Sequence, residues 1–226
     1  LGNGRFYTMR QNYKPYKIPT FGYPKLRLNL IVEYTDGSKE TVSTNTSWKL
    51  TTEGPIRSNN EYDGEEYDAR KELGNWTQNG YDDKNWMPAQ RVSIPSGTLR
   101  AQMMPGMKVM DTLKPASIKK FGDKYILDFG QNMAGWGRFR IKGQAGDSIR
   151  LRFAETLQAN GELFTRNLRD ARSTDVYIIS GHEAKDATWA PRFIYHGFRY
   201  VEVDGYPGAK AEDFVAEVVE DEMEHT

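Results

Sequence analysis

The stretch "YILDFGQNMAGWGRFRIKG", residues 125–143, decides the fold class because it alternates like a β-strand at both of its ends. Apolar side chains occupy alternate positions over 125–129 and again over 139–141. Between them, residues 130–137 include three glycines, two amides and a tryptophan. We interpret these eight residues as a glycine-rich bend between two strands of one core, in which the glycines adopt backbone angles closed to other residues.

The same period of two recurs along the chain. "LRLNLIVEY", residues 26–34, places alternating apolar side chains on one face and runs into Asp36-Gly37, a strong hairpin-turn signal. No run of ten or more residues has a helical period, and only short turns are expected, near 81–86 and 166–171. Further alternation occurs at 149–153, 176–179, 198–203 and 214–219.

The sequence therefore predicts an all-β fold of two tandem antiparallel, jelly-roll-like β-sandwiches, with strands at 26–34, 148–154 and 198–204. The seam between them is expected in "QMMPGMKVMDTLKP", residues 102–115, where Pro105-Gly106 disfavours a continuous helix. The predicted domains are a first sandwich at 1–104, a second at 105–220 and an exit linker at 221–226.

Composition excludes several classes of partner. With 31 Lys+Arg and 31 Asp+Glu the chain has no net charge, so it lacks the basic footprint expected for nucleic acid or an anionic membrane. No apolar stretch approaches the ~20 residues that span a bilayer. Cysteine is absent, which excludes disulfides and thiol catalysis. We expect no nucleic-acid and no membrane partner, and the compartment stays open between bacterial periplasm, cell surface and cytoplasm.

The common catalytic motifs are missing as well. The three histidines, at 182, 196 and 225, fit no HExxH or His/carboxylate metal pattern. No G-x-S-x-G elbow, Walker loop or dinucleotide fingerprint occurs. We therefore expect no catalytic residue and assign no metal ligand.

Carboxylates are densest in "EYDGEEYDAR", residues 61–70. Alternate strand residues lie roughly 6.6 Å apart, near the separations that glycosidases use. The segment could also bind sugar hydroxyls or a hard cation such as calcium. We favour a polar loop whose carboxylates pair with Arg70 and with backbone amides, ahead of binding or docking and well ahead of catalysis. Its candidate site residues are Asp63, Glu65, Tyr67 and Arg70.

Two further groups of polar side chains are candidates for sugar contact or for docking onto another domain. One is Gln131, Asn132 and Trp136 in the glycine-rich stretch, since amides beside an aromatic ring are typical of sugar-binding surfaces. The other is Tyr195, His196 and Arg199 near a strand start. In both groups we favour a structural or interdomain role over direct sugar contact.

Seven segments occur here in the same order as in bacterial α-L-rhamnosidases, and the resemblance covers essentially the whole chain. In that family these segments belong to the non-catalytic β-sandwich region that precedes a catalytic (α/α)6 barrel. The turn "YDDKNWMP" is also similar to the F-D-D-S-x-W-x-P turn of galactose-binding-like modules. The seven segments are "LGNGRFY", "FGYPKLRLNLIVEYTDGS", "YDGEEYDAR", "DFGQNMAGW", "LRFAETL", "GELFTRNLRDARSTDVYI" and "APRFIYHGFRYVEVDGYPG".

The resemblance implies a galactose-binding-like jelly roll followed by a concanavalin-like sandwich. It further implies an interior fragment, with strands of the first jelly roll missing before Leu1 and the catalytic carboxylates in a barrel after Thr226. Some members of the family bind rhamnose through calcium in the first jelly roll. Calcium is thus a candidate cofactor, but its ligands cannot be placed on this chain.

The resemblance implies an accessory region that supports the barrel of an enzyme releasing terminal L-rhamnose, with carbohydrate binding as a further role. The expected partners are that barrel, rhamnose-containing glycans through the parent enzyme, and a second copy of the chain through exposed sheet edges. An independent carbohydrate-binding module or lectin is the alternative. A small sandwich glycosidase is the weakest hypothesis, because the only alternating acidic triplet, Glu220, Glu222 and Glu224, lies in the tail. Alone, the chain is predicted to be inactive.

Overall fold

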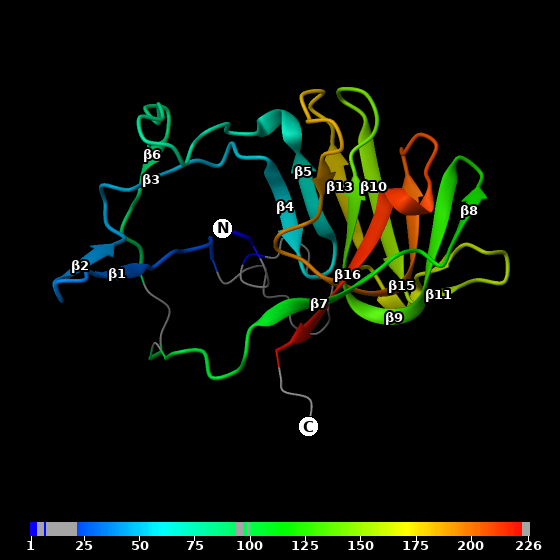
Figure 1. Cartoon of the computed structure of the whole chain (residues 1–226), viewed down its shortest axis with the longest axis horizontal. Helices are drawn as coiled ribbons and strands as arrows, with labels where there is room; N and C mark the ends of the chain where they lie inside the picture. Colours follow the sequence, from blue (N-terminus) through cyan, green and yellow to red (C-terminus); the bar gives the residue numbers. More distant parts are fainter. Residues whose placement is uncertain (4–6, 8–21, 94–96, 99, 223–226) are drawn as a thin grey trace.

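The computed structural model describes residues 1–3, 7, 22–93, 97–98 and 100–222, and strands dominate it (Figure 1). These residues contain no α-helix, only the short 3-10 helices η1 (Ala69–Lys71), η2 (Arg166–Leu168) and η3 (Ala211–Asp213). The all-β prediction is confirmed. None of the described helices is long and apolar enough to cross a membrane.

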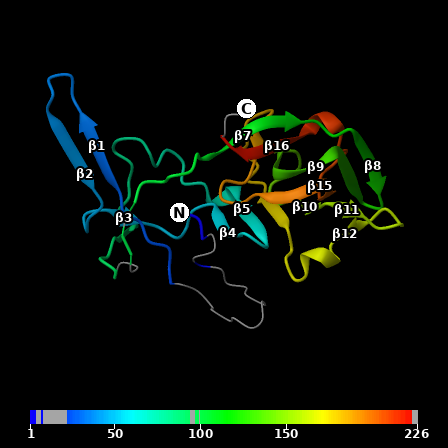
Figure 2. The same cartoon turned by 90° about the horizontal axis from the view of Figure 1, so that it is seen from below.

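One curled ten-stranded sheet holds most of the strand residues (Figure 2). Adjacent strands of this sheet are antiparallel, except that β5 and β13 run parallel to each other. β8 (Ser117–Phe121) and β14 (Thr188–Trp189) pair with β9 beside the main path. The main path runs β4 (Ile56–Asn60), β5 (Gly64–Asp68), β13 (Thr174–Ile178), β10 (Ser148–Ala154), β15 (His196–Asp204), β9 (Lys124–Arg140), β16 (Phe214–Asp221), β7 (Met107–Leu113).

The predicted bend at 130–137 is wrong, because β9 is one continuous strand of 17 residues. What interrupts the pattern is a large bulge: Tyr200 pairs with Asp128, whereas Phe198 pairs with Met133. Gly130, inside this bulge, has a φ of +84° and needs glycine for that reason. Gly135 does not have a positive φ. A Cβ there would lie 2.0 Å from the backbone oxygen of Glu217 on β16, so this glycine allows two strands to approach.

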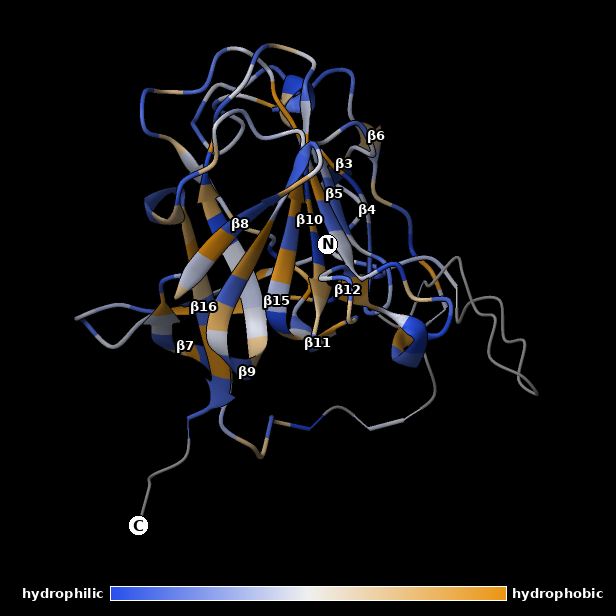
Figure 3. Ribbon diagram, turned by 90° about the vertical axis from the view of Figure 1, so that its right-hand side faces the viewer, coloured by the Kyte–Doolittle hydropathy of each residue, from blue (hydrophilic) through white to orange (hydrophobic). Residues whose placement is uncertain are grey.

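Hydrophobic and hydrophilic residues alternate along strands of the large sheet (Figure 3). The buried hydrophobic residues form the core on one face of this sheet. Alternate residues of β10, β15 and β9 supply it, as the period of two predicted. Burying each such side chain contributes roughly 1.5–3 kcal/mol. The largest fully buried apolar side chains are Phe139, Phe153, Phe198, Leu127, Ile149, Leu151, Val201 and Val203.

Each of the three predicted strands has a counterpart. β10 coincides with 148–154, β15 contains 198–204, and β1 (Asn29–Glu33) lies inside 26–34. β1 forms a hairpin with β2 (Lys39–Ser43), and Gly37 at its turn has a φ of +84°.

The N-terminal half of the chain contributes little to the core. No described residue in 22–58 or 72–113 is buried, and these ranges hold the β1–β2 hairpin and the β3 (Lys49–Leu50)–β6 (Met87–Pro88) pair. The third two-stranded pair, β11 (Thr156–Leu157) with β12 (Leu163–Phe164), lies instead beside the core. β4 and β5 fall within the range predicted for the first domain, yet they join the large sheet through β13. The domain boundaries stay a prediction.

Candidate functional site

β9 and β15 bring two of the predicted groups of residues together on one face. Gly135 pairs with His196 and Met133 with Phe198, and all four point into the core. The intervening pair, Ala134 and Gly197, therefore faces outward. The residues two positions away from them along the chain share this orientation. We call this surface the β9/β15 outer face and define it by Asn132, Ala134, Trp136, Tyr195 and Gly197. All of them are exposed except Trp136, which is half-buried.

Two carboxylates hold the polar groups of the β9/β15 outer face in fixed orientations. The Asn132 side-chain amide donates to Glu155 at 2.9 Å, and the Asn167 amide donates to the other oxygen of Glu155 at 3.4 Å. The Trp136 indole N–H donates to Glu217 at 2.6 Å. Gln131, the third candidate of the glycine-rich stretch, is exposed beside them. The surface is thus preorganised, which lowers the entropy cost of binding a partner.

Arg199 braces the bulge of β9 rather than offering a free cation. Its guanidinium donates to both carboxylate oxygens of Asp128, at 2.8 and 3.0 Å. Asp128 also accepts the backbone N–H of Gly130 at 2.7 Å. The hydrogen bond from Arg199 holds the pKa of Asp128 below its ordinary value, and the bulge backbone assists. Arg199 therefore fixes the bulge.

His196 lies in a buried polar network instead of on the surface. Its Nε2 is 3.1 Å from both oxygens of Asp175, and its Nδ1 is 3.3 Å from the Ser173 hydroxyl. Its ring stacks on Phe153, with the centroids 4.1 Å apart. The order Ser–His–Asp matches a nucleophilic triad in composition. Since all three residues are more than nine-tenths buried, no substrate can reach the serine, and the group is structural.

Glu65 completes this network from β5. Its side chain is fully buried, and its two oxygens accept the backbone N–H groups of Arg192 and Phe193, each at 3.1 Å. Its own backbone N–H donates to Asp175 at 2.9 Å. Burial raises the pKa of the Glu65 carboxyl above its ordinary value, and the nearby charge of Asp175 adds to the rise against the two backbone donors.

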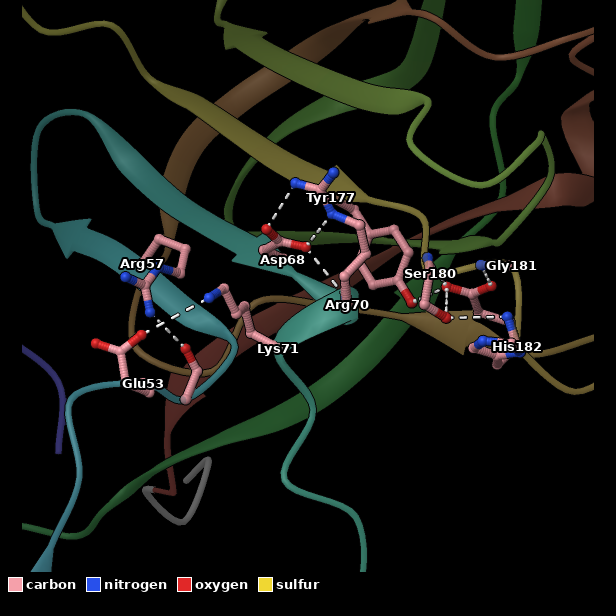
Figure 4. A network of polar contacts seen from close by, with 11 residues as sticks. Glu53, Arg57, Asp68, Arg70, Lys71, Tyr177, Ser180, Gly181 and His182 are labelled. Atoms are coloured by element: carbon pink, nitrogen blue, oxygen red, sulfur yellow. Dashed lines mark hydrogen bonds and ion pairs between the residues drawn. The ribbon is translucent and has the colours of Figure 1, made fainter. Parts of the chain in front are cut away.

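The interpretation of 61–70 as a loop around Arg70 is wrong in part. Residues 64–68 form strand β5, and among the described carboxylates Arg70 pairs with that of Asp68, at 2.8 Å (Figure 4). Asp63 is buried and lies 3.4 Å from Arg172. Tyr67 is in the core, and its hydroxyl donates to Glu72. The other part of the interpretation, that carboxylates of this segment pair with backbone amides, is correct for Glu65.

This arrangement explains which chemistry is accessible. The carboxylates of Glu65 and Asp175 are buried and engaged, and Asp63, which borders a groove, pairs with Arg172, so none of the three is free to act on a glycosidic bond. Within the described ranges, no group of three or more His, Asp or Glu side chains could hold a metal. Calcium binding by the first sandwich thus finds no ligand set there and stays a prediction.

Sequence reasoning missed Asp175, Ser173, Glu155 and Asn167. One signal could have pointed to Asp175: in "TDVYI" it shares the inward face with Tyr177, so an acid had to be buried. The others had no such signal, because they meet their partners through contacts distant in sequence.

Two family models match consecutive parts of this chain. The α-L-rhamnosidase N-terminal domain model matches residues 1–111, and the bacterial α-L-rhamnosidase concanavalin-like domain model matches residues 118–220. The chain belongs to the bacterial α-L-rhamnosidase family. Glu65 lies in the part matched by the first model, and Arg192, Asp175 and His196 lie in the part matched by the second.

Curated α-L-rhamnosidases show the same relationship. One from Streptomyces avermitilis is 42% identical over 195 residues, covering 82% of this chain and 18% of the relative. One from Formosa agariphila is 40% identical over 190 residues, covering 83% of this chain and 20% of the relative. The chain thus spans about a fifth of the length of these relatives.

Solved structures agree with the sequence matches. The α-L-rhamnosidase from Dictyoglumus thermophilum superposes with a TM-score of 0.86 at 39% identity, over 98% of this chain and 24% of that one. The Streptomyces avermitilis enzyme, solved in complex with L-rhamnose, superposes with a TM-score of 0.80 at 37% identity, over 86% of this chain and 19% of that one. The native enzyme from Aspergillus terreus superposes with a TM-score of 0.81 at 40% identity, over 88% of this chain and 23% of that one.

Proposed function

We propose that this chain is an accessory β region of an α-L-rhamnosidase, a glycoside hydrolase that releases terminal L-rhamnose, and that it supports and orients the catalytic domain. One observation carries the proposal: the N-terminal and concanavalin-like domain models match residues 1–111 and 118–220, while the chain spans only about a fifth of its relatives. The engaged carboxylates of Asp63, Glu65 and Asp175 support it, since none of these three is free to act as an acid or base.

The β9/β15 outer face is the docking surface in this proposal. Its centre, Ala134 and Gly197, has almost no side chain, so a partner backbone or ring can approach the sheet closely. Tyr195, half exposed at 50%, rises beside it as an anchor of the kind that dominates interfaces. Asn132 and Trp136 are held by Glu155 and Glu217, so docking orders few groups.

Carbohydrate binding at the same face is the second candidate function, favoured by one observation. By the register of His196 with Gly135, Tyr195 lies across from Trp136, and Asn132 presents its side-chain amide on the same face, four residues earlier on β9. Aromatic rings that stack on sugars, next to amides that hydrogen-bond hydroxyls, are the elements of such sites. Dimerisation through the exposed edges of the β1–β2 hairpin also stays a proposal.

The test compares the chain with the complete product of its gene. In the complete protein, Tyr195→Ala should lower the melting temperature of the catalytic domain and its kcat, because the variant weakens docking. In the 226-residue chain alone, the same variant should change the melting temperature little, since Tyr195 is half exposed. Arg57→Ala, at an exposed residue of β4, is the matched control. A gene product without a catalytic domain, or equal effects in both proteins, would refute the accessory role.

A further inference from the structure

We propose that a groove on the polar face of the large sheet binds a neutral saccharide. The groove encloses about 410 Å³, which is within the size range of small-ligand sites. It lies opposite the hydrophobic core. Leu151 and Tyr177 point into the core, so their strand neighbours Arg152, Val176 and Thr174 point into the groove.

Most charges that line the groove neutralise one another. Lys124 pairs with Glu202 at 2.8 Å, and Arg150 pairs with Asp204 at 3.5 Å. With the inward-facing Glu65 set aside, the lining contains four cationic and four acidic side chains. The groove therefore attracts neither anions nor cations as a class, which favours an uncharged ligand.

Two groups of opposite character remain available for hydrogen bonding. Arg152 makes one side-chain hydrogen bond, to the Thr165 hydroxyl at 3.3 Å. Within the described part of the chain, Glu66 makes no ion pair and no side-chain hydrogen bond. Arg152 lies on β10 and Glu66 on β5, with β13 between them, so the strands are about 10 Å apart.

A polyhydroxylated ligand suits this pair. A guanidinium only donates hydrogen bonds and a carboxylate only accepts them, whereas each sugar hydroxyl can do both. Between the two, β13 presents Val176, the apolar side chain of the lining. It offers a dry contact for a methyl group, so the groove should prefer a 6-deoxy sugar to its 6-hydroxy counterpart. This site is separate from the β9/β15 outer face, and it rests on the proposed function only for the choice of probe.

The experiment is a ¹H–¹⁵N correlation titration of the 226-residue chain with methyl α-L-rhamnoside. We expect saturable shifts at the backbone amides of residues 150–152 and 174–176, with millimolar affinity. Arg152→Met should weaken binding about tenfold, the loss of one charge-assisted hydrogen bond. The matched control is Arg140→Met, which breaks an exposed ion pair with Asp186 on another part of the sheet.

Two further arms test ligand class. L-Mannose, which differs from L-rhamnose by a hydroxyl at C6, should bind more weakly, and the isosteric Val176→Thr should reduce that difference. A uronate sugar should not bind better than rhamnose. The inference is overturned by absence of saturable shifts, by shifts on the β9/β15 outer face instead, by equal affinity of Arg152→Met, or by uronate preference. None of these outcomes would bear on the accessory role, which the docking experiment tests independently.

Discussion

The carboxylate of Glu65 accepts the backbone N–H of Arg192 at 3.1 Å, joining positions 127 apart in the chain. The other oxygen of Glu65 takes the N–H of Phe193, and the Glu65 backbone donates to Asp175. One buried acid thus connects β5, from the part that matches the N-terminal domain model, to two segments of the concanavalin-like part. We infer that Glu65 makes the two parts one cooperative unit.

Glu65→Ala should therefore destabilise the chain by about 2–4 kcal/mol, since it removes the acceptor of two backbone donors and leaves a cavity at a fully buried position. Urea denaturation followed by tryptophan fluorescence would measure the loss. Glu66→Ala is the matched control. The Glu66 side chain follows Glu65 in the sequence but points to the opposite face, and it makes no ion pair with the described residues. Equal losses in the two variants would contradict the role given to Glu65.

The pH dependence of this effect has a definite sign. In the folded chain the pKa of Glu65 is raised above its ordinary value of 4.5. At a pH between the unfolded-state pKa and the raised folded-state pKa of Glu65, the folded state holds a proton that the unfolded state releases. The free energy of unfolding therefore falls as the pH rises through that range. Glu65→Gln cannot titrate there. The free energy of unfolding of the wild type, relative to Glu65→Gln, should be highest below pH 4.5, decline as the pH rises and then level off above the folded-state pKa. A relative stability that increases with pH would show that the carboxylate is preferred on folding.

Gly135 is a test of the close approach between β9 and β16. In Gly135→Ala the new Cβ would meet the Glu217 backbone oxygen at 2.0 Å, and backbone cannot move aside as a side chain can. We expect a loss of about 3 kcal/mol, at the upper end for overpacking. Gly106→Ala, where nothing lies within 4 Å and φ is not positive, should change stability by less than about 1 kcal/mol. Thermal melts of both variants decide the matter, and similar melting temperatures would argue against the strand spacing described.

Alternation predicted the strands that form the core. Ile149, Leu151 and Phe153 recur with a period of two and are all buried, so β10 could be placed from sequence alone. The glycine-rich stretch misled because glycine has two uses that a sequence does not separate. Gly130 serves the turn of a bulge, whereas Gly135 makes room for a neighbouring strand.

The candidate site was harder to predict because its contacts are non-local. β5 pairs in parallel with β13, more than a hundred residues later, and no local pattern encodes that partner. His196 shows the consequence: from sequence it is a polar group near a strand start, yet it lies between Asp175 and Ser173 in the interior. Tyr195, one residue earlier, has the opposite orientation and is exposed.

The last prediction is that the chain alone hydrolyses no glycoside. Cleavage by the common routes needs a carboxylic acid and a second carboxylate on either side of one bond, both within reach of substrate. Glu65 is the acid whose pKa burial raises, but its side chain is fully buried and its oxygens are occupied by backbone donors. On the open face, Glu66 is unpaired among the described residues, but Glu202 and Asp204 are each paired with a cation, so neither is available as its partner carboxylate.

Incubating the purified chain at high concentration with an aryl α-L-rhamnoside should therefore release no aryl alcohol above buffer. Release that disappears in Glu65→Gln, while that variant keeps its fold by circular dichroism, would make the β5 segment an active site and overturn the prediction. Release that persists unchanged in Glu65→Gln would indicate a contaminating enzyme rather than an active site in the β5 segment. Repeating the assay after a second chromatographic step would then remove the activity.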